Sequence, residues 1–238
     1  MYNSKANDLI EYYPINSLNE LNIDYVKSLC YNNFNKTLFT GGLDGNICYY
    51  DIDSLKPNTI YSTKNNLLYH TDNNNSIYSI DTSFNGNIIS TSVYNNIIDI
   101  YDIRVKSSLF KLSKHNDLIK TIKISPSGDI LLSGGCDKVV YLWDLRYNNK
   151  VLKTWDYYCG SIIDIKPING FSEFLSSDIK GNLFYTNILN NVYTKLTSLD
   201  NEILTSISVD ESNLNILCSS NFCNIYEYVR QFILLILK

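Results

Sequence analysis

The residue types on which most enzyme sites depend are scarce in this sequence of 238 residues. Histidine occurs only twice, at His70 and His115, and methionine occurs once. Nucleophilic triads, general acid–base pairs and metal centres draw largely on histidine. The sequence also lacks the GxxxxGK[ST], GxGxxG, HExxH and GxSxG motifs. We therefore expect no catalysis, no small-molecule substrate and no cofactor.

Closely spaced cysteine pairs are also missing. Six cysteines are present, but no two of them form a CxxC pair, so we expect no metal site. The first ten residues, MYNSKANDLI, contain no apolar core of a signal peptide. Because free thiols without such a signal are typical of a reducing compartment, we expect an intracellular protein, cytoplasmic or nuclear.

Concentrated positive charge and long apolar runs are absent as well. The formal net charge is −4, and no basic cluster is denser than Arg104-Val105-Lys106, which argues against nucleic acid as a partner. The longest apolar run, Phe232–Leu237, is too short to span a bilayer, so we expect no membrane insertion. We interpret residues 230–238 as an apolar C-terminal strand or a truncated end.

The most informative stretch of the chain is His115–Arg146. It contains three segments of alternating apolar and polar residues, separated by turn residues: Leu118–Ile124, Asp129–Ser133 and Val139–Leu145. Alternation between turns predicts consecutive antiparallel strands. With a histidine before the first strand, an aspartate in the second turn and a closing Trp-Asp, the stretch resembles a WD-repeat, one blade of a β-propeller.

The rest of the chain contains weaker copies of this stretch, closed by Tyr50-Asp51, Tyr101-Asp102, Thr186-Asn187 and Tyr226-Glu227. Their spacing is close to the blade period of about 40–45 residues. We expect an all-β WD-repeat propeller of about five blades, each with four antiparallel strands, or an incomplete piece of a ring of about seven or eight. The expected segments are an N-terminal tail, 1–23, with a closing strand at Leu9–Tyr13, and repeats at 24–74, 75–114, 115–158, 159–200 and 201–229.

The WD-repeat resemblance implies a hydrogen-bonded tetrad in the third repeat, formed by His115, Ser133, Asp137 and Trp143. Asp137 would accept from His115, and the imidazole would connect through the Ser133 hydroxyl to the indole N–H. Such a network satisfies buried polar groups and ties a loop to two strands. The alternative is a site with His115 as a base and Asp137 as its orienting residue. In other repeats, Tyr50 and Tyr101 replace the tryptophan and Asn95 replaces the aspartate.

Two further features suggest sites only superficially. The pairs Gly41-Gly42 and Gly134-Gly135 look like phosphate cradles, but they lie in predicted hairpins, so we interpret them as turn residues. His70 does not occupy the position of His115, and we expect it to be a solvated loop residue.

Arginine follows the closing dipeptide in two adjacent repeats, at Arg104 and Arg146. Trp-Asp-x-Arg boxes occur in WD-repeat substrate receptors of cullin-RING ubiquitin ligases, where the arginine helps to contact the ligase adaptor. The resemblance therefore implies Arg104 and Arg146 as partner contacts. The alternative is a pair of strand-end arginines on a solvated rim.

The order of several segments is similar to the middle blades of the WD-repeat cofactor family that activates ubiquitin-specific proteases. These segments are DYVKSLCY, TGGLDGNI, the Asn-rich insert before SIYSI, IYDIR and SSDIKGNLFYTNI. The resemblance implies a non-catalytic protein–protein interaction scaffold, acting as a regulatory partner of a deubiquitinase in ubiquitin signalling. The alternatives are a substrate receptor of a cullin-RING ligase and a generic WD-repeat assembly scaffold.

Overall fold

The strands of the computed structural model form five separate antiparallel sheets that follow one another along the chain. Each sheet falls within one of the five repeats expected from the sequence. The structure describes residues 25–52, 67–70, 76–105, 107–147, 150–199, 202–210, 212 and 215–229.

The strands have the following bounds. The first sheet contains β1 (Val26–Asn32), β2 (Thr37–Gly42), β3 (Asn46–Asp51) and β4 (Leu67–His70). The second contains β5 (Ile77–Thr82), β6 (Ile88–Val93), β7 (Ile97–Asp102) and β8 (Ser107–Ser113). The third contains β9 (Ile119–Ile124), β10 (Ile130–Gly135), β11 (Val140–Asp144) and β12 (Lys150–Trp155). The fourth contains β13 (Ile162–Ile168), β14 (Glu173–Asp178), β15 (Asn182–Asn187) and β16 (Val192–Ser198), with a 3-10 turn, η2 (Asn169–Phe171). The fifth contains β17 (Leu204–Val209), β18 (Asn215–Ser220) and β19 (Ile225–Val229).

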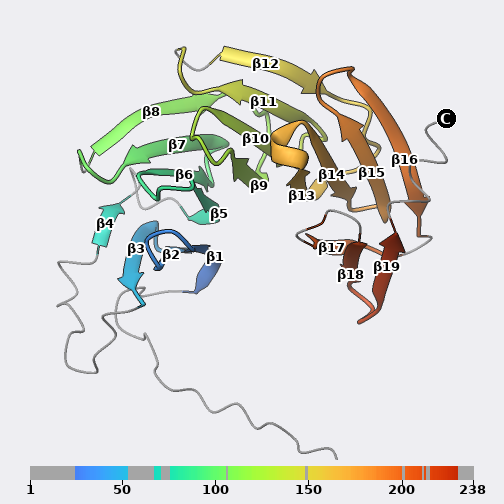
Figure 1. Ribbon diagram of the computed structural model, residues 1–238, viewed down its shortest axis with the longest axis horizontal. Coiled ribbons are helices and arrows are strands. Elements are labelled where there is room, and N and C mark those ends of the chain that lie inside the picture. Colours follow the sequence, from blue (N-terminus) through green and yellow to red (C-terminus); the bar gives the residue numbers. More distant parts are fainter. Residues whose placement is uncertain are drawn as a thin grey trace, which may run out of the picture.

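The sheets are arranged as the blades of a β-propeller, which confirms the predicted fold class (Figure 1). Four blades have four strands, whereas the fifth has three within the described part of the chain. The predicted strand at Leu9–Tyr13 and the apolar segment 230–238 lie outside the described residues.

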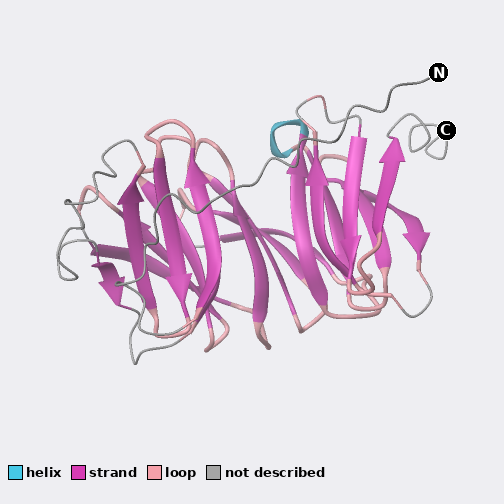
Figure 2. Ribbon diagram, turned by 90° about the horizontal axis from the view of Figure 1, so that it is seen from below, coloured by secondary structure: helices cyan, strands magenta, loops and turns pink. Residues whose placement is uncertain are grey.

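The first strands of the blades, β1, β5, β9, β13 and β17, contact one another in chain order along the inside of the arc. The alternating sequence explains the difference between inner and outer strands. The outer strand β12 alternates exposed and partly buried positions, whereas β11 is buried at every position because blades cover both of its faces. The first and last sheets lie at the two ends of the arc, apart from each other in both views (Figures 1 and 2).

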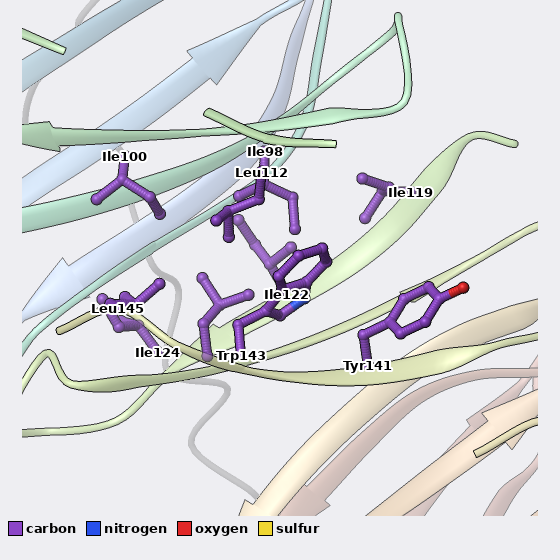
Figure 3. Packing of buried hydrophobic residues seen from close by; sticks show 10 residues of the cluster. Ile98, Ile100, Leu112, Ile119, Ile122, Ile124, Tyr141, Trp143 and Leu145 are labelled. Carbon is purple, nitrogen blue, oxygen red and sulfur yellow. The ribbon is translucent and has the colours of Figure 1, made fainter. Parts of the chain in front are cut away.

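Among the described residues, the core contains four apolar seams, each between two neighbouring blades, and a small cluster of Cys48 and Tyr50 in the first blade. Figure 3 shows the seam between the second and third blades, where Ile98, Ile100 and Leu112 face Trp143 and Ile122. Full burial of each such side chain contributes roughly 1.5–3 kcal/mol. The fold is therefore stabilised mainly by contacts between blades.

The paired glycines were interpreted from sequence as turn residues, but they lie at strand ends, and only the second of each pair, Gly42 or Gly135, accepts the hydrogen bond of the following turn. Gly41-Gly42 ends strand β2 and Gly134-Gly135 ends strand β10. A Cβ on Gly134 would lie 2.7 Å from Cγ2 of Ile162 and 2.8 Å from Cδ1 of Ile165. Glycine is required there because the next blade packs directly on the backbone. In the turn that follows, the residue with positive φ is Lys138, at 65°.

His70 also differs from its prediction as a loop residue. It is the last residue of β4 and pairs with Asn46 of β3. Strand β4 was not recognised from sequence because it lies in the insert before the second blade. With only four residues, the strand is too short to show a clear alternation.

Candidate functional site: a buried tetrad and two aspartate–arginine clamps

The third blade brings His115, Ser133, Asp137 and Trp143 together. Nδ1 of His115 lies 2.8 Å from Oδ2 of Asp137, and Nε2 lies 2.7 Å from Oγ of Ser133. Nε1 of Trp143 donates to the same hydroxyl oxygen over 2.8 Å. Because a carboxylate only accepts, Nδ1–H of His115 donates to Asp137, and Nε2 forms the second hydrogen bond, with the Ser133 hydroxyl. Each polar side-chain atom of these four residues then has a hydrogen-bond partner.

Strand pairing sets this geometry. Ser133 pairs with Tyr141 across β10 and β11, and Trp143 pairs with Leu131 on the same hairpin. The hydroxyl and the indole are therefore two positions apart on one face. The His115 ring packs edge-on against Tyr141, with ring centroids 4.7 Å apart, which orients the imidazole from the loop before β9.

Asp137 is held as a carboxylate at the turn. Burial alone would raise its pKa, but the hydrogen bond and charge of His115, together with the backbone N–H groups of Asn116 and Val139, outweigh that effect and lower the pKa. The Asn116 N–H lies 3.1 Å from Oδ2 and the Val139 N–H 3.3 Å from Oδ1. The carboxylate thus ties the loop before β9 to the turn after β10.

The tetrad has a counterpart in the fourth blade that the sequence analysis missed. Tyr158 stands four residues before β13, as His115 stands four residues before β9. Its hydroxyl lies 2.6 Å from Oγ of Ser176, at the register position of Ser133. The neighbouring Tyr157 bonds Thr186, at the register position of Trp143. Burial raises the pKa of both tyrosines.

The closing residue of the fifth repeat was assigned incorrectly from sequence. Tyr226 pairs with Cys218, and Tyr228 pairs with Ile216. The position of Trp143 is therefore occupied by Tyr228, two residues later than expected. Tyr226 and Tyr228 are two positions apart, so they lie on the same face of the strand. Only the strand register shows which of them occupies the position of Trp143.

Arg104 and Arg146 each form a bidentate clamp with the aspartate two residues earlier. Nε and Nη2 of Arg104 lie 3.0 and 2.6 Å from the carboxylate oxygens of Asp102. The corresponding distances from Arg146 to Asp144 are 3.1 and 2.9 Å. In both pairs the guanidinium hydrogen bond lowers the pKa of the aspartate.

The clamps place two guanidinium groups at equivalent positions of adjacent blades. Asp102 pairs with Ile88 and Asp144 pairs with Ile130, so both clamps stand at the same end of the third strand. The carboxylates are buried, whereas the arginine side chains are 65% and 54% exposed. Each clamp therefore holds the guanidinium group of its arginine in a fixed position that a partner can reach.

In the described part of the chain, no group of three or more His, Cys, Asp and Glu side chains could hold a metal ion. No described helix is long and apolar enough to cross a membrane.

A family model for the "WD domain, G-beta repeat" matches residues 16–51 and 106–144. The second segment contains the whole tetrad, and the first extends through β1, β2 and β3. The described residues form a five-bladed β-propeller, and two of its segments are similar to WD repeats.

Two curated relatives match larger parts of the chain. Transcription factor unc-37 of Caenorhabditis elegans is 27% identical over 140 residues, which cover 59% of this chain and 21% of that protein. SAGA complex subunit Spt8 of Schizosaccharomyces pombe is 27% identical over 203 residues, which cover 75% of this chain and 38% of that protein. The chain thus spans less than two fifths of the length of either relative.

Proposed function

We propose that this chain is a non-catalytic scaffold for protein–protein interaction. The observation that carries the proposal is the pair of clamps, in which Arg104 and Arg146 project from equivalent positions of adjacent blades. Arginine is enriched among residues that dominate binding energy at interfaces. A guanidinium held in place by a buried carboxylate loses less side-chain entropy on binding than a free one.

The tetrad supports a structural role and not a catalytic one. A nucleophile must reach the substrate, but Ser133 is fully buried and its hydroxyl is bonded to both His115 and Trp143. In this proposal the tetrad rigidifies the third blade, which carries one of the two clamps.

The substrate-receptor role in a cullin-RING ligase is the finer proposal that the clamps favour. Purified chain would be mixed with the ligase adaptor, and binding would be compared with that of Arg104→Ala/Arg146→Ala. We expect the double variant to lose binding by on the order of 100-fold, as for two interface arginines. Lys195→Ala, with a charge on another blade, serves as the matched control. Equal binding by wild type and double variant, or none by wild type, would rule out this role.

A regulatory partner of a deubiquitinase is the alternative supported by the order of segments and the insert before the second blade. The test is cleavage of ubiquitin-rhodamine by candidate ubiquitin-specific proteases, with and without the chain. A rate increase together with a stable complex supports it, whereas no rate change and no complex contradicts it. The relatives are named for transcription and for the SAGA complex, so their names support membership in a regulatory assembly but do not specify ubiquitin.

A further inference from the structure

Two phenylalanine rings lie side by side on the surface, on neighbouring turns of the first two blades. The ring centroids of Phe34 and Phe84 are 5.2 Å apart, and the two side chains are 65% and 62% exposed. Phe34 lies in the turn between β1 and β2, and Phe84 lies in the turn between β5 and β6. Single exposed apolar side chains are ordinary, whereas contiguous ones are typical of interaction sites. We call Phe34 and Phe84 the aromatic pair.

Hydrogen bonds hold the two turns of the aromatic pair in place. The side chain of Asn32 accepts from the N–H of Phe34 over 3.0 Å and donates to the carbonyl oxygen of Phe84 over 3.1 Å. The N–H of Phe84 donates over 2.9 Å to the carbonyl oxygen of Pro126, in the turn between β9 and β10. The turns that carry the rings are thus tied to each other and to the third blade. Because they are already ordered, a partner that covers the rings loses little affinity to the ordering of these turns.

The aromatic pair lies on the same face of the propeller as the two clamps. The residue before Arg104 donates its N–H to the carbonyl oxygen of Asn87 over 2.9 Å, in the turn that carries the second ring. The residue before Arg146 donates in the same way to Asp129 over 2.8 Å, in the turn between β9 and β10. Since the first strand of each blade is the innermost, the aromatic pair lies nearer the inside of the arc and the clamps lie further out.

The exposed charged groups of this face are mainly basic, although the whole chain has a formal net charge of −4. The described turns that form the face in the first three blades are residues 32–36, 83–87, 103–105, 125–129 and 145–147. In these turns Lys36, Arg104 and Arg146 are exposed, whereas the one acidic residue, Asp129, is partly buried. The aspartates of the clamps are buried. The face therefore offers cationic groups to a partner beside its aromatic pair.

The clamps leave donor groups for an anionic acceptor. A guanidinium has five N–H donors, and each clamp uses Nε and Nη2 on the side of its own aspartate. The remaining N–H groups can donate to a carboxylate of a partner, in the charge-assisted geometry that arginine favours. An apolar surface next to such donors matches a ligand that combines apolar and acidic groups.

We propose that this face binds an acidic peptide segment of a partner protein, in which large apolar side chains lie next to carboxylates. The apolar side chains cover the aromatic pair, and the carboxylates accept hydrogen bonds from Arg104 and Arg146. The inference rests on the proposed scaffold function, in which the clamps contact a partner, and it adds the chemistry of that partner.

The inference is tested by selecting linear peptides from a random display library on the whole purified chain. Enriched peptides are expected to combine large apolar residues with aspartate or glutamate. Fluorescein-labelled copies of them are then titrated with the chain, and fluorescence anisotropy gives the dissociation constants. Phe34→Ser/Phe84→Ser should weaken binding by at least about tenfold, as for truncation of aromatic residues at the centre of an interface. Copies in which lysine replaces each acidic residue should not bind.

Phe222→Ser is the matched control, because Phe222 is 60% exposed but lies in the turn between β18 and β19. A turn between the second and third strands of a blade lies at the opposite end of the strands from the aromatic pair. The control should bind the peptides like wild type. Circular dichroism would show that the variants remain folded, as expected for exposed positions.

The inference is overturned if no peptide is enriched, if the enriched peptides lack acidic residues, or if Phe34→Ser/Phe84→Ser binds them like wild type. Binding of the chain to phosphatidylserine vesicles that this variant loses also overturns it, because the face would then fit a lipid surface. Arg104→Ala/Arg146→Ala separates the inference from the proposed function. If only the phenylalanine variant binds like wild type, the inference fails and the clamps remain partner contacts. If both variants bind like wild type, both proposals fail.

Discussion

The hydroxyl oxygen of Ser133 accepts the indole N–H of Trp143 over 2.8 Å, in a place that solvent does not reach. The same hydroxyl lies 2.7 Å from Nε2 of His115. One small side chain thus connects a loop histidine to the central tryptophan of a seam. Loss of this hydroxyl leaves Nε2 of His115 and Nε1 of Trp143 without their hydrogen-bond partner.

Ser133→Ala is therefore expected to lower the free energy of unfolding by about 2–4 kcal/mol, since each unsatisfied buried group costs about 1–3 kcal/mol. Urea unfolding followed by tryptophan fluorescence measures the change. Ser208→Ala, at an exposed position of β17, is the control and should change stability by less than about 0.5 kcal/mol. A loss below about 1 kcal/mol for Ser133→Ala would contradict the role of the hydroxyl.

Gly134→Ala is expected to cost about 1–3 kcal/mol, because its Cβ would overlap Ile162 and Ile165 of the next blade. Thermal unfolding would record the change. Ser92 occupies the same register position in the second blade, and its hydroxyl has no hydrogen-bond partner among the described residues. Ser92→Ala should thus be neutral or slightly stabilising. If Gly134→Ala were as stable as wild type, the seam would be looser than the structure shows.

Tyr158→Phe should destabilise the fourth blade by about 1–2 kcal/mol through loss of the bond to Ser176. Tyr193→Phe, at a half-exposed position of β16, is the matched control with the same chemical change. Differential scanning calorimetry of both variants separates the effects. Equal transition temperatures for the two variants would show that the Tyr158 hydroxyl has no structural role.

Stability at acid pH should depend on Asp137, whose pKa is lowered in the folded state. A lowered pKa contributes stability that is fully present above the unfolded pKa of about 3.9 and is lost as pH falls through the folded value. The advantage of wild type over Asp137→Asn should be constant from neutral pH to about pH 5 and shrink below about pH 4. Urea unfolding across this range measures it. If the stability advantage of wild type over Asp137→Asn grew as pH fell, the pKa of Asp137 would not be lowered in the folded state, and this prediction would be refuted.

The cysteines should differ in reactivity towards a disulfide reagent at pH 8. Burial raises the pKa of Cys30 and Cys48 to about 11 and that of Cys218 to about 12. At pH 8 on the order of one in a thousand such thiols or fewer is ionised, and only the thiolate attacks. Cys159 and Cys223 are exposed and should react first. Cys159→Ser/Cys223→Ser should remove the fast phase, and a fast phase that persists would contradict this order.

Much of the architecture could be predicted from sequence because its signals are local. Alternating residues between turns predicted the strands, and their repetition predicted blades, since a sheet with two apolar faces must be covered on both sides. The residues of the tetrad could be named because the third repeat resembles a WD-repeat and all four residues lie within that repeat. The arginine positions were visible for the same reason.

Contacts between blades were decided only by the tertiary structure. Gly134 is small because of Ile162 and Ile165 in the next repeat. Alternation marks a face as apolar, but it does not say which surface covers that face. Val26 and Leu29 have the same sequence character as Ile77 and Ile80, yet the first pair is exposed and the second pair is buried. Burial depends on residues that are distant along the chain, so the local sequence pattern does not predict it.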